Sequence, residues 1–352
     1  LPTTFAFLIP PTTIVGMRAC WIFTIALCLP LLVFGSAPVT KLIIDSDLFS
    51  DVDDAAALLV ACGHPTVTLM GVMINYPSIY SALAASSILG YYSYSDVPVG
   101  LKRPFSNDTF FDAWTYQLGE YASKVAYNWR HNASMPWGDA SNAWYPVELY
   151  RKLLSEADDH SVTIASIGFL DNLYELLSSP SDGYSPLSGH DLVKAKVEEL
   201  VIMGGAYPCG YEYNFYGNNA SATAHVVSTW PGPMTFSGSE LGATVYSGAR
   251  LTVEGPGGDP VNAAYRWYTG YNTSRSSWDP LTVLYAIDGL GSMFEYANNG
   301  GQNYVYPDGR NEWLPDNPLY PQKYLKLRMS EIQAGEILDV LYLDTARRAA
   351  RR

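Results

Sequence analysis

The chain has 352 residues, of which 48% are hydrophobic and 16% are charged, and its formal net charge at pH 7 is -13. This composition is typical of a globular protein with a sizeable core and excludes an intrinsically disordered chain. The acidic balance also excludes a nucleic-acid backbone as partner, because binding phosphates requires a clustered basic surface. The only basic cluster, at 347–352, is predicted to be a solvated tail.

The first 37 residues have the organisation of a targeting segment. Met17 is followed by an arginine, an apolar run at 20–34 and small residues at 35–37. A charged start, an apolar stretch and a small-residue exit are typical of a secretory signal peptide. The run is shorter than the ~20 apolar residues that a membrane span needs, so cleavage is expected rather than anchoring. The sequence therefore predicts translation from Met17, with 1–16 upstream of the start, and a secreted, extracellular protein without a stable membrane span.

Four N-glycosylation sequons agree with passage through a secretory compartment. Their asparagines are Asn107, Asn132, Asn219 and Asn272. Two cysteines, Cys62 and Cys209, remain after signal cleavage. In an oxidising compartment they form either one disulfide or two buried thiols, and two cysteines alone do not make a zinc site.

Strand-like and helix-like segments alternate from residue 41 onward. The predicted strands are 41–44, 67–74, 97–100, 162–167 and 200–203, and the predicted helices are 53–62, 79–92, 147–157 and 170–178. This alternation predicts an open, mostly parallel, Rossmann-like α/β sheet with helices on both faces. No repeat or low-complexity linker divides the chain, so 38–346 is predicted to form a single domain. Its long loops are rich in tyrosine and tryptophan, which either stack on a ligand or cover a core.

The segment KLIIDSDLFSDVDDAAALLVA, residues 41–61, places five aspartates within ten residues. Asp45 and Asp47 end a predicted strand two residues apart, so both side chains project to one face while the strand persists. Asp53 and Asp54 begin a helix, where the helix dipole favours anions. These carboxylates therefore converge at the carboxyl end of the first strand, where open α/β sheets bind ligands. Oxygen ligands without histidine or cysteine select a hard cation, Ca²⁺ or Mg²⁺.

Other interpretations account for the acidic segment less well. An EF-hand loop requires an oxygen ligand, a glycine and a glutamate where this chain has Phe49, Ser50 and Ala56. A phosphatase-type D-x-D with an aspartyl nucleophile leaves the later aspartate pair without a role. A simple acidic helix start explains that pair and leaves the first two aspartates unexplained. Because the D-x-D pattern fits in part, a metal-dependent phosphatase is kept as a candidate function, ranked third behind the two described below.

The acidic segment resembles the D-x-D-x-x-x-D-D-A signature of the inosine/uridine-preferring nucleoside hydrolases, with two extra residues before the aspartate pair. Later motifs follow in the family's order. They are VTIASIGFLDN at 162–172, similar to a strand ending in T-G-P-L-T-N; MGGA at 203–206, similar to M-G-G; EYNF at 212–215, similar to E-F-N-I; and WDPL at 278–281, where the family has H-D-A. The resemblance implies the family's α/β fold and an enzyme that hydrolyses the N-glycosidic bond of ribonucleosides to free base and ribose.

The resemblance also implies roles for single residues. The implied Ca²⁺ ligands are Asp47, Asp54, Asp279 and the backbone carbonyl of Ile167. The implied substrate-binding residues are Asp53, Asn75, Glu212, Asn214 and Trp278, with Asp45 in a supporting role. Asp47 is further implied as the base that takes a proton from the water attacking C1′. Asp51 falls in the two-residue insertion.

Two departures from the family pattern bear on activity. Phe49 stands where the family usually has glycine, so the path of the first loop is expected to differ. Trp278 replaces the histidine that is thought to protonate the departing base, and none of the five histidines lies in a matched motif. The alternative function is therefore a secreted nucleoside- or sugar-binding protein that keeps the metal site without turnover. The sequence leaves open the preferred base, its proton donor and whether the chain forms a homo-oligomer.

Overall fold

The computed structural model describes residues 39–49, 51–109, 118–298, 300–315 and 322–352. By its internal contacts the chain divides into Leu1–Ala37 and Pro38–Arg352, and the description below concerns the second unit. The predicted signal peptide and start codon lie outside the described residues. Within those ranges, no helix has both the length and the apolar composition that a membrane crossing requires.

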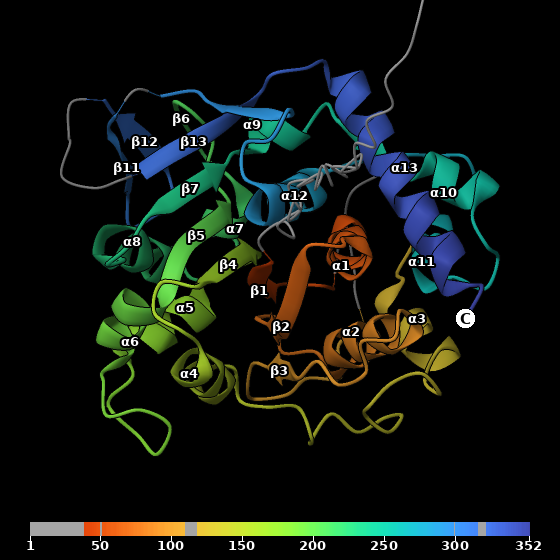
Figure 1. Cartoon of the computed structure of the whole chain (residues 1–352), viewed down its shortest axis with the longest axis horizontal. Helices are drawn as coiled ribbons and strands as arrows, with labels where there is room; N and C mark the ends of the chain where they lie inside the picture. The colour runs from red at the N-terminus through yellow and green to blue at the C-terminus, as the bar shows by residue number, and fades with distance from the viewer. Residues whose placement is uncertain (1–38, 50, 110–117, 299, 316–321) are drawn as a thin grey trace, which may run out of the picture. The chain divides into compact units, whose positions relative to one another are not determined.

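Eight strands form the central sheet in the order β10-β13-β7-β5-β4-β1-β2-β3 (Figure 1). Their bounds are β1 Thr40–Ser46, β2 Val67–Ile74, β3 Val99–Leu101, β4 Val162–Ile167, β5 Val197–Met203, β7 Met234–Ser237, β10 Phe294–Tyr296 and β13 Gln322–Leu327. Every neighbouring pair is parallel except β10 with β13. The predicted open, mostly parallel sheet is therefore confirmed.

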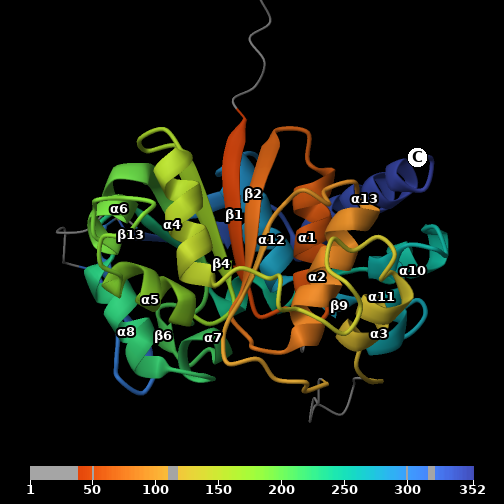
Figure 2. The same ribbon diagram turned by 90° about the horizontal axis from the view of Figure 1, so that it is seen from below.

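Helices cover both faces of this sheet, as predicted (Figure 2). Their bounds are α1 Asp53–Gly63, α2 Ile79–Tyr91, α3 Ala122–Asn128, α4 Pro146–Glu156, α5 Asp171–Ser178, α6 Gly189–Lys196, α7 Tyr213–Tyr216, α8 Ala220–Thr229, α9 Ser239–Gly242, α10 Ala249–Glu254, α11 Pro260–Tyr268, α12 Trp278–Asp288 and α13 Glu331–Ala349. Successive side chains of a strand point to opposite faces. Leu42 and Ile44 accordingly join the cluster under α1, α2 and α12, whereas Ile43 joins the cluster under α4, α5 and α6.

Strand β1 lies where the direction of winding changes. The chain continues from β1 to β2 and β3 on one side, and from β4 to β5 and β7 on the other. Ser46 pairs with Ile74 of β2 and with Ile167 of β4, so the carboxyl ends of these three strands are level. Such a switch point leaves a crevice at the carboxyl edge of the sheet. In Figure 2 β1 enters at the top, and this edge faces the bottom.

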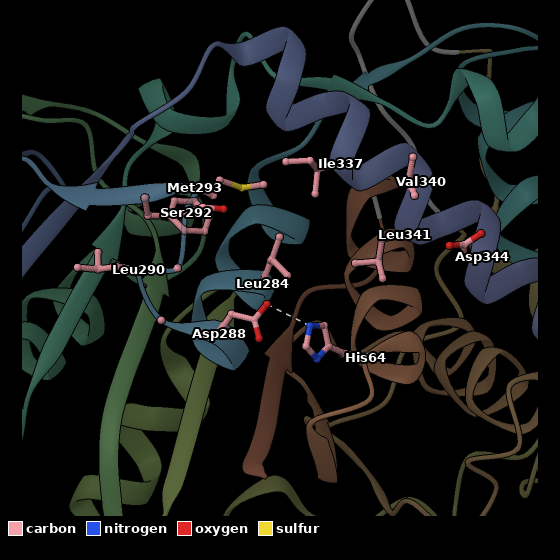
Figure 3. Close-up of a pocket in the computed structure, with 13 residues that line it drawn as sticks. His64, Leu284, Asp288, Leu290, Ser292, Met293, Ile337, Val340, Leu341 and Asp344 are labelled. Carbon is pink, nitrogen blue, oxygen red and sulfur yellow. Dashed lines mark hydrogen bonds and ion pairs between the residues drawn. The ribbon is translucent and has the colours of Figure 1, made fainter. Parts of the chain in front are cut away.

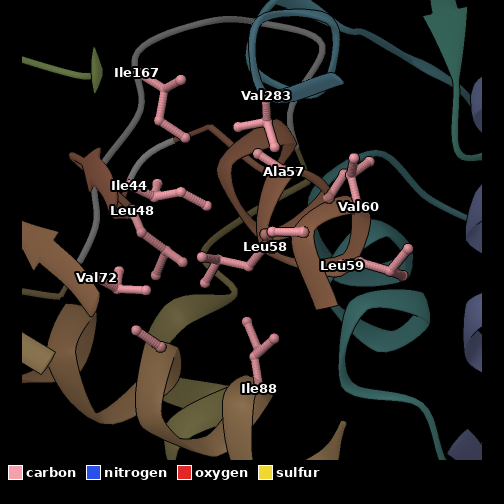
Figure 4. Packing of buried hydrophobic residues seen from close by; sticks show 14 of the residues in the cluster. Ile44, Leu48, Ala57, Leu58, Leu59, Val60, Val72, Ile88, Ile167 and Val283 are labelled. Carbon is pink, nitrogen blue, oxygen red and sulfur yellow. The ribbon is translucent and has the colours of Figure 1, made fainter. Parts of the chain in front are cut away.

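Helix α1 is at the centre of the larger core cluster (Figure 4). Its residues from Asp53 to Ala61 are all buried, which agrees with an alanine- and leucine-rich sequence that is apolar on every side. Leu58 packs among side chains from β1, β2 and α2 that include Ile44, Val72 and Ile88. The acidic start of α1 is thereby fixed against the sheet by the apolar remainder of the helix.

Several features differ from the sequence predictions. Two further sheets are present, one of β11 Gln302–Val305, β12 Asn311–Leu314 and β6 Cys209–Gly210, the other of β8 Tyr246–Ser247 and β9 Arg275–Ser276. Helix α13 runs into the predicted basic tail, and Arg348 donates to the carbonyl of Gly63 at 2.6 Å. Both cysteines are free: Cys62 is half-buried and Cys209 is exposed, so only one of the two thiols is shielded. The sequon residues Asn107, Asn219 and Asn272 are exposed and Asn132 is half-buried.

Replacing Leu58 by alanine should lower the free energy of unfolding by about 2–5 kcal/mol, because the site is 0% exposed and the lost methyl groups leave a cavity. Urea unfolding followed by circular dichroism measures this. Ile332→Ala is the matched control, since that side chain is 75% exposed on α13 and its loss should change stability by about 0.5 kcal/mol or less. Equal shifts for the two variants would contradict the core described above.

Candidate active site

The level ends of β1, β2 and β4 bring three chain segments into contact. Asp47, Asn75 and Gly168 follow these strands directly or within one residue. A Cβ atom added to Gly168 would lie 2.5 Å from the backbone nitrogen of Asp47, 2.8 Å from Asp47 Oδ1 and 2.9 Å from Asn75 Nδ2. Glycine is therefore required here by the close approach of the other two segments.

Two helix N-termini add three more carboxylates to this edge. Asp53 and Asp54 begin α1, and Asp279 lies in the first turn of α12. Each of the three can offer one carboxylate oxygen so that these oxygens all lie within 4.8 Å of one another. The backbone N–H of Asp279 donates to Asp53 Oδ2 at 3.2 Å, and Ser46 Oγ donates to Asp54 Oδ1 at 2.6 Å. We call Asp53, Asp54 and Asp279 the carboxylate cluster.

Burial dominates the electrostatics of this edge. It raises the pKa of Asp47 to about 7, and the charges of Asp51 and Asp45 act in the same direction. Burial followed by the charges of neighbouring aspartates also holds the pKa of Asp54 and of Asp279 well above the ordinary value. Buried carboxylates that raise one another's pKa are a site where a cation would be stabilising.

Asp45, at the carboxyl end of β1, is 0% exposed. It accepts hydrogen bonds from Tyr150 Oη at 2.8 Å, from Asn75 Nδ2 at 2.8 Å and from Asn172 Nδ2 at 3.1 Å. Burial raises its pKa to about 7 against the effect of these donors. Asn75 also donates to the carbonyl of Phe169 at 2.9 Å, and its Oδ1 has no partner among the described residues. The hydrogen bond to Asp45 therefore fixes the orientation of the Asn75 amide, and its Oδ1 remains available to accept a hydrogen bond.

The two-residue insertion of the first loop is tied to the start of α12. Arg275 Nε lies 2.9 and 3.0 Å from the two carboxylate oxygens of Asp51, and Tyr121 Oη donates to the Asp51 carbonyl at 2.7 Å. The guanidinium carbon of Arg275 lies 5.0 Å from the centroid of the Trp278 ring. Phe49, in the same loop, stacks on Tyr76 with centroids 4.1 Å apart. The loop that was expected to differ from the family is therefore packed inward.

Trp278 is half-buried at the first position of α12. Its indole N–H donates to the carbonyl of Ser239 at 2.7 Å. A Cβ atom added to Gly242 would lie 2.6 Å from Trp278 Cδ1, so α9 packs directly on the indole. Trp278 thus holds α9 against the start of α12, and its stacking on a base stays a prediction.

Glu212 and Asn214 follow the carboxyl end of β5. Glu212 Oε1 accepts from the backbone N–H of Asn214 at 2.9 Å, and Oε2 accepts from that of Gly205 at 3.2 Å. Asn214 Nδ2 donates to the carbonyl of Met203 at 3.1 Å. Burial raises the pKa of Glu212 to about 8, and the charge of Asp47 contributes to the rise. Both residues therefore lie at the carboxyl edge of the sheet, like the carboxylate cluster.

A cavity of about 320 Å³ lies elsewhere (Figure 3). It is lined by the ends of α1 and α12, where His64 and Asp288 are 3.1 Å apart, and by Ile337 and Leu341 of α13. Because both helices begin at the carboxylate cluster, this cavity is at the opposite end of each helix and is not part of the candidate active site.

Sequence reasoning assigned no role to three residues that shape the site. Tyr150 and Asn172 hold Asp45, and Arg275 holds Asp51. The signals available were the last position of the matched motif at 162–172 for Asn172 and the arginine three positions before Trp278 for Arg275, whereas Tyr150 had none. The predicted roles of Asp47, Asp54, Asp279 and the other site residues stay predictions, although all of them occur at this one edge of the sheet.

Comparison with known proteins places the chain in a family. A profile of the inosine-uridine preferring nucleoside hydrolases matches residues 42–311. No curated protein sequence matches the chain at a significant level. The chain belongs to the inosine-uridine preferring nucleoside hydrolase family and is therefore a glycosidase that acts on N-glycosyl bonds. The predicted family is confirmed.

Solved structures of nucleoside hydrolases share the fold. A plant nucleoside hydrolase is 19% identical with a TM-score of 0.64, covering 88% of this chain and 99% of that one. The inosine-uridine preferring nucleoside hydrolase from Bacillus anthracis is 16% identical with a TM-score of 0.61, covering 87% and 100%. The purine-preferring ribonucleoside hydrolase from Gardnerella vaginalis is 16% identical with a TM-score of 0.63, covering 89% and 99%. The predicted fold class is confirmed.

Gly168→Ala should lower nucleoside hydrolysis by about 10²-fold, since an added methyl group displaces the Asp47 segment and a displacement of about 1 Å can cost that much. Release of free ribose measures the effect. Gly183→Ala is the matched control, because a Cβ atom there meets nothing within 4 Å, and it should leave the rate unchanged. Full activity of Gly168→Ala would show that the contact with Asp47 does not matter.

Proposed function

We propose that this protein hydrolyses ribonucleosides to free base and ribose in a Ca²⁺-dependent reaction. The proposal is carried by the carboxylate cluster, whose oxygens lie within 4.8 Å of one another at the switch point of a nucleoside hydrolase fold. A small nucleoside is the proposed substrate, which is consistent with the family.

The residues present fit a hard divalent cation. The donors are buried carboxylate oxygens that raise one another's pKa, and oxygen donors of this kind suit Ca²⁺. The residues proposed to hold the ion are Asp47, Asp54, Asp279 and the backbone carbonyl of Ile167. When bound, Ca²⁺ supplies positive charge that lowers the pKa of water and attracts sugar hydroxyls.

Asp47 is the proposed base. Its carboxylate lies at the end of β1 against Gly168, where it is held in place to accept a proton from a water molecule. Water attacks C1′ of the ribose from one face, loses its proton to Asp47, and the electron pair of the C1′–N bond leaves with the base. This is the logic of an inverting glycosidase, with an oxocarbenium-like sugar in the transition state.

The remaining polar residues are proposed to orient the ribose. Glu212 and Asn214 are held by backbone groups of β5 and its loop, so their positions are set before a substrate binds. Asn75 offers its Oδ1, which is buried and has no partner within the described part of the chain. Asp53 lies in the carboxylate cluster beside the proposed metal ligands. Buried acceptors of this kind penalise sugars that lack the matching hydroxyl groups.

The second candidate is a secreted nucleoside- or sugar-binding protein without turnover. It is favoured by Trp278, which occupies the place of the family's catalytic histidine and donates to a backbone carbonyl. Calorimetric titration of a nucleoside, run beside the ribose assay, separates the two candidates. We also propose an extracellular location, which the four sequons support.

Removal of Ca²⁺ by EDTA should lower ribose release from inosine or uridine by about 10³-fold or more, because the ion's charge stabilises the transition state by several kcal/mol. Added Ca²⁺ should restore the rate and raise the Tm, since an ion that binds only the folded state stabilises it. Asp279→Asn should lose both effects.

Asp139→Asn is the matched control, because Asp139 is an exposed aspartate outside the site, and it should behave like the wild type. An unchanged rate of ribose release after thorough chelation with EDTA would contradict the proposed Ca²⁺ dependence. A Tm that rises equally in Asp279→Asn would place the ion elsewhere.

A further inference from the structure

Tyr150 contacts the candidate active site from a helix on the other face of the sheet. It lies on α4, in the core cluster that contains Ile43, whereas α1 and α12 pack on the opposite face. Its hydroxyl donates to Asp45 Oδ2 at 2.8 Å. Burial and the charge of Asp45 hold the pKa of Tyr150 well above its ordinary value, so the hydroxyl stays protonated near neutral pH. Tyr150 is therefore a fixed, neutral donor to a buried carboxylate.

The other oxygen of Asp45 holds two side-chain amides. Oδ1 accepts from Asn75 Nδ2 at 2.8 Å and from Asn172 Nδ2 at 3.1 Å. With Tyr150 on Oδ2, each carboxylate oxygen has its own donors, and the carboxylate has one favoured orientation. Without the Tyr150 hydroxyl, Oδ2 would lose its donor, and turning toward the amides would recover a hydrogen bond. The Tyr150 hydroxyl therefore determines how Asp45 meets Asn75.

The Asn75 amide has one orientation that satisfies these contacts. Its Nδ2 carries two hydrogens and has two acceptors, Asp45 Oδ1 and the carbonyl of Phe169 at 2.9 Å. A flipped amide would place Oδ1 against two acceptors, which repel it. Oδ1 must therefore point away from both of them. It is buried there and has no partner among the described residues, so a donor from a ligand would satisfy it.

Asn75 presents this acceptor next to the proposed base. A Cβ atom added to Gly168 would lie 2.9 Å from Asn75 Nδ2 and 2.8 Å from Asp47 Oδ1, so the two side chains lie on either side of Gly168. Asn172 also has a buried Oδ1 without a partner in the described part of the chain. Its Nδ2 donates to Asp45 and lacks the second acceptor that fixes the Asn75 amide. Asn75 is therefore the better-oriented acceptor for a substrate.

We propose that Tyr150 is a positioning residue for sugar recognition, because through Asp45 it keeps Asn75 as an acceptor that requires a sugar hydroxyl. The inference rests on the proposed function, in which Asn75 binds the ribose. It extends that function to the substrate class: a ribonucleoside supplies the donor, and a nucleoside without that hydroxyl leaves Oδ1 buried and unpaired. Tyr150 makes and breaks no bond of the substrate, so its effect is on the discrimination between sugars.

The test compares kcat/KM of the wild type and of Tyr150→Phe for inosine, 2′-deoxyinosine and 3′-deoxyinosine. Tyr150→Phe should lower kcat/KM for inosine by about 10-fold, because one hydrogen bond between enzyme and substrate contributes about that much. For one of the two deoxynucleosides the value should change by no more than about twofold. That substrate lacks the hydroxyl that Asn75 binds, so it has no such hydrogen bond to lose.

Tyr92→Phe is the matched control. The Tyr92 hydroxyl donates to Asp259 Oδ2 at 2.7 Å, between the end of α2 and the start of α11, so the variant removes a buried hydrogen bond of the same kind elsewhere. It should lower the Tm as Tyr150→Phe does, and it should leave the ratio of kcat/KM between the sugars unchanged. In an Asn75→Ala background, Tyr150→Phe should change this ratio no further.

Each other outcome counts against the inference. An equal loss of kcat/KM for all three nucleosides in Tyr150→Phe would assign Tyr150 a purely structural role and overturn the proposal. An unchanged value for inosine would overturn it as well, as would a ratio that Tyr92→Phe alters equally or that Tyr150→Phe still alters when Asn75 is absent. A wild type that cleaves none of the three nucleosides would instead contradict the proposed function, and the inference with it.

Discussion

The structure depends on holding three buried carboxylates close together. Asp53, Asp54 and Asp279 can each offer one carboxylate oxygen so that these three oxygens lie within 4.8 Å of one another. Like charges in a buried site repel one another. The fold opposes this repulsion with the N-termini of α1 and α12, with the hydroxyl of Ser46 and with apolar packing along both helices. A divalent cation would turn the remaining repulsion into attraction, which is why metal binding and stability are expected to be linked.

Asp51 of the first loop and Trp278 of α12 are linked through Arg275. Asp51, in the inserted residues of the first loop, binds Arg275, and the Arg275 guanidinium lies on the ring of Trp278. Trp278 in turn donates to the carbonyl of Ser239. Trp278 thus has a structural role, because it ties α9 to the start of α12.

The periodicity of apolar residues predicted the strands whose formation depends on residues close together in the sequence. Strands 67–74 and 162–167 were predicted at their observed bounds, because each is an apolar, β-branched run between turn residues. The short strands of the two smaller sheets have two to four residues and no periodicity to detect. Tyr150 and Arg275 reach their aspartates across 105 and 224 residues, so only the tertiary fold reveals them.

The most direct test of the carboxylate cluster is a crystal structure of the protein grown with Ca²⁺. The account predicts one ion at the carboxyl end of β1, with oxygen ligands at 2.3–2.6 Å from Asp54, Asp279 and the carbonyl of Ile167. An ion bound only at another place, or a cluster that stays without an ion at saturating Ca²⁺, would contradict it.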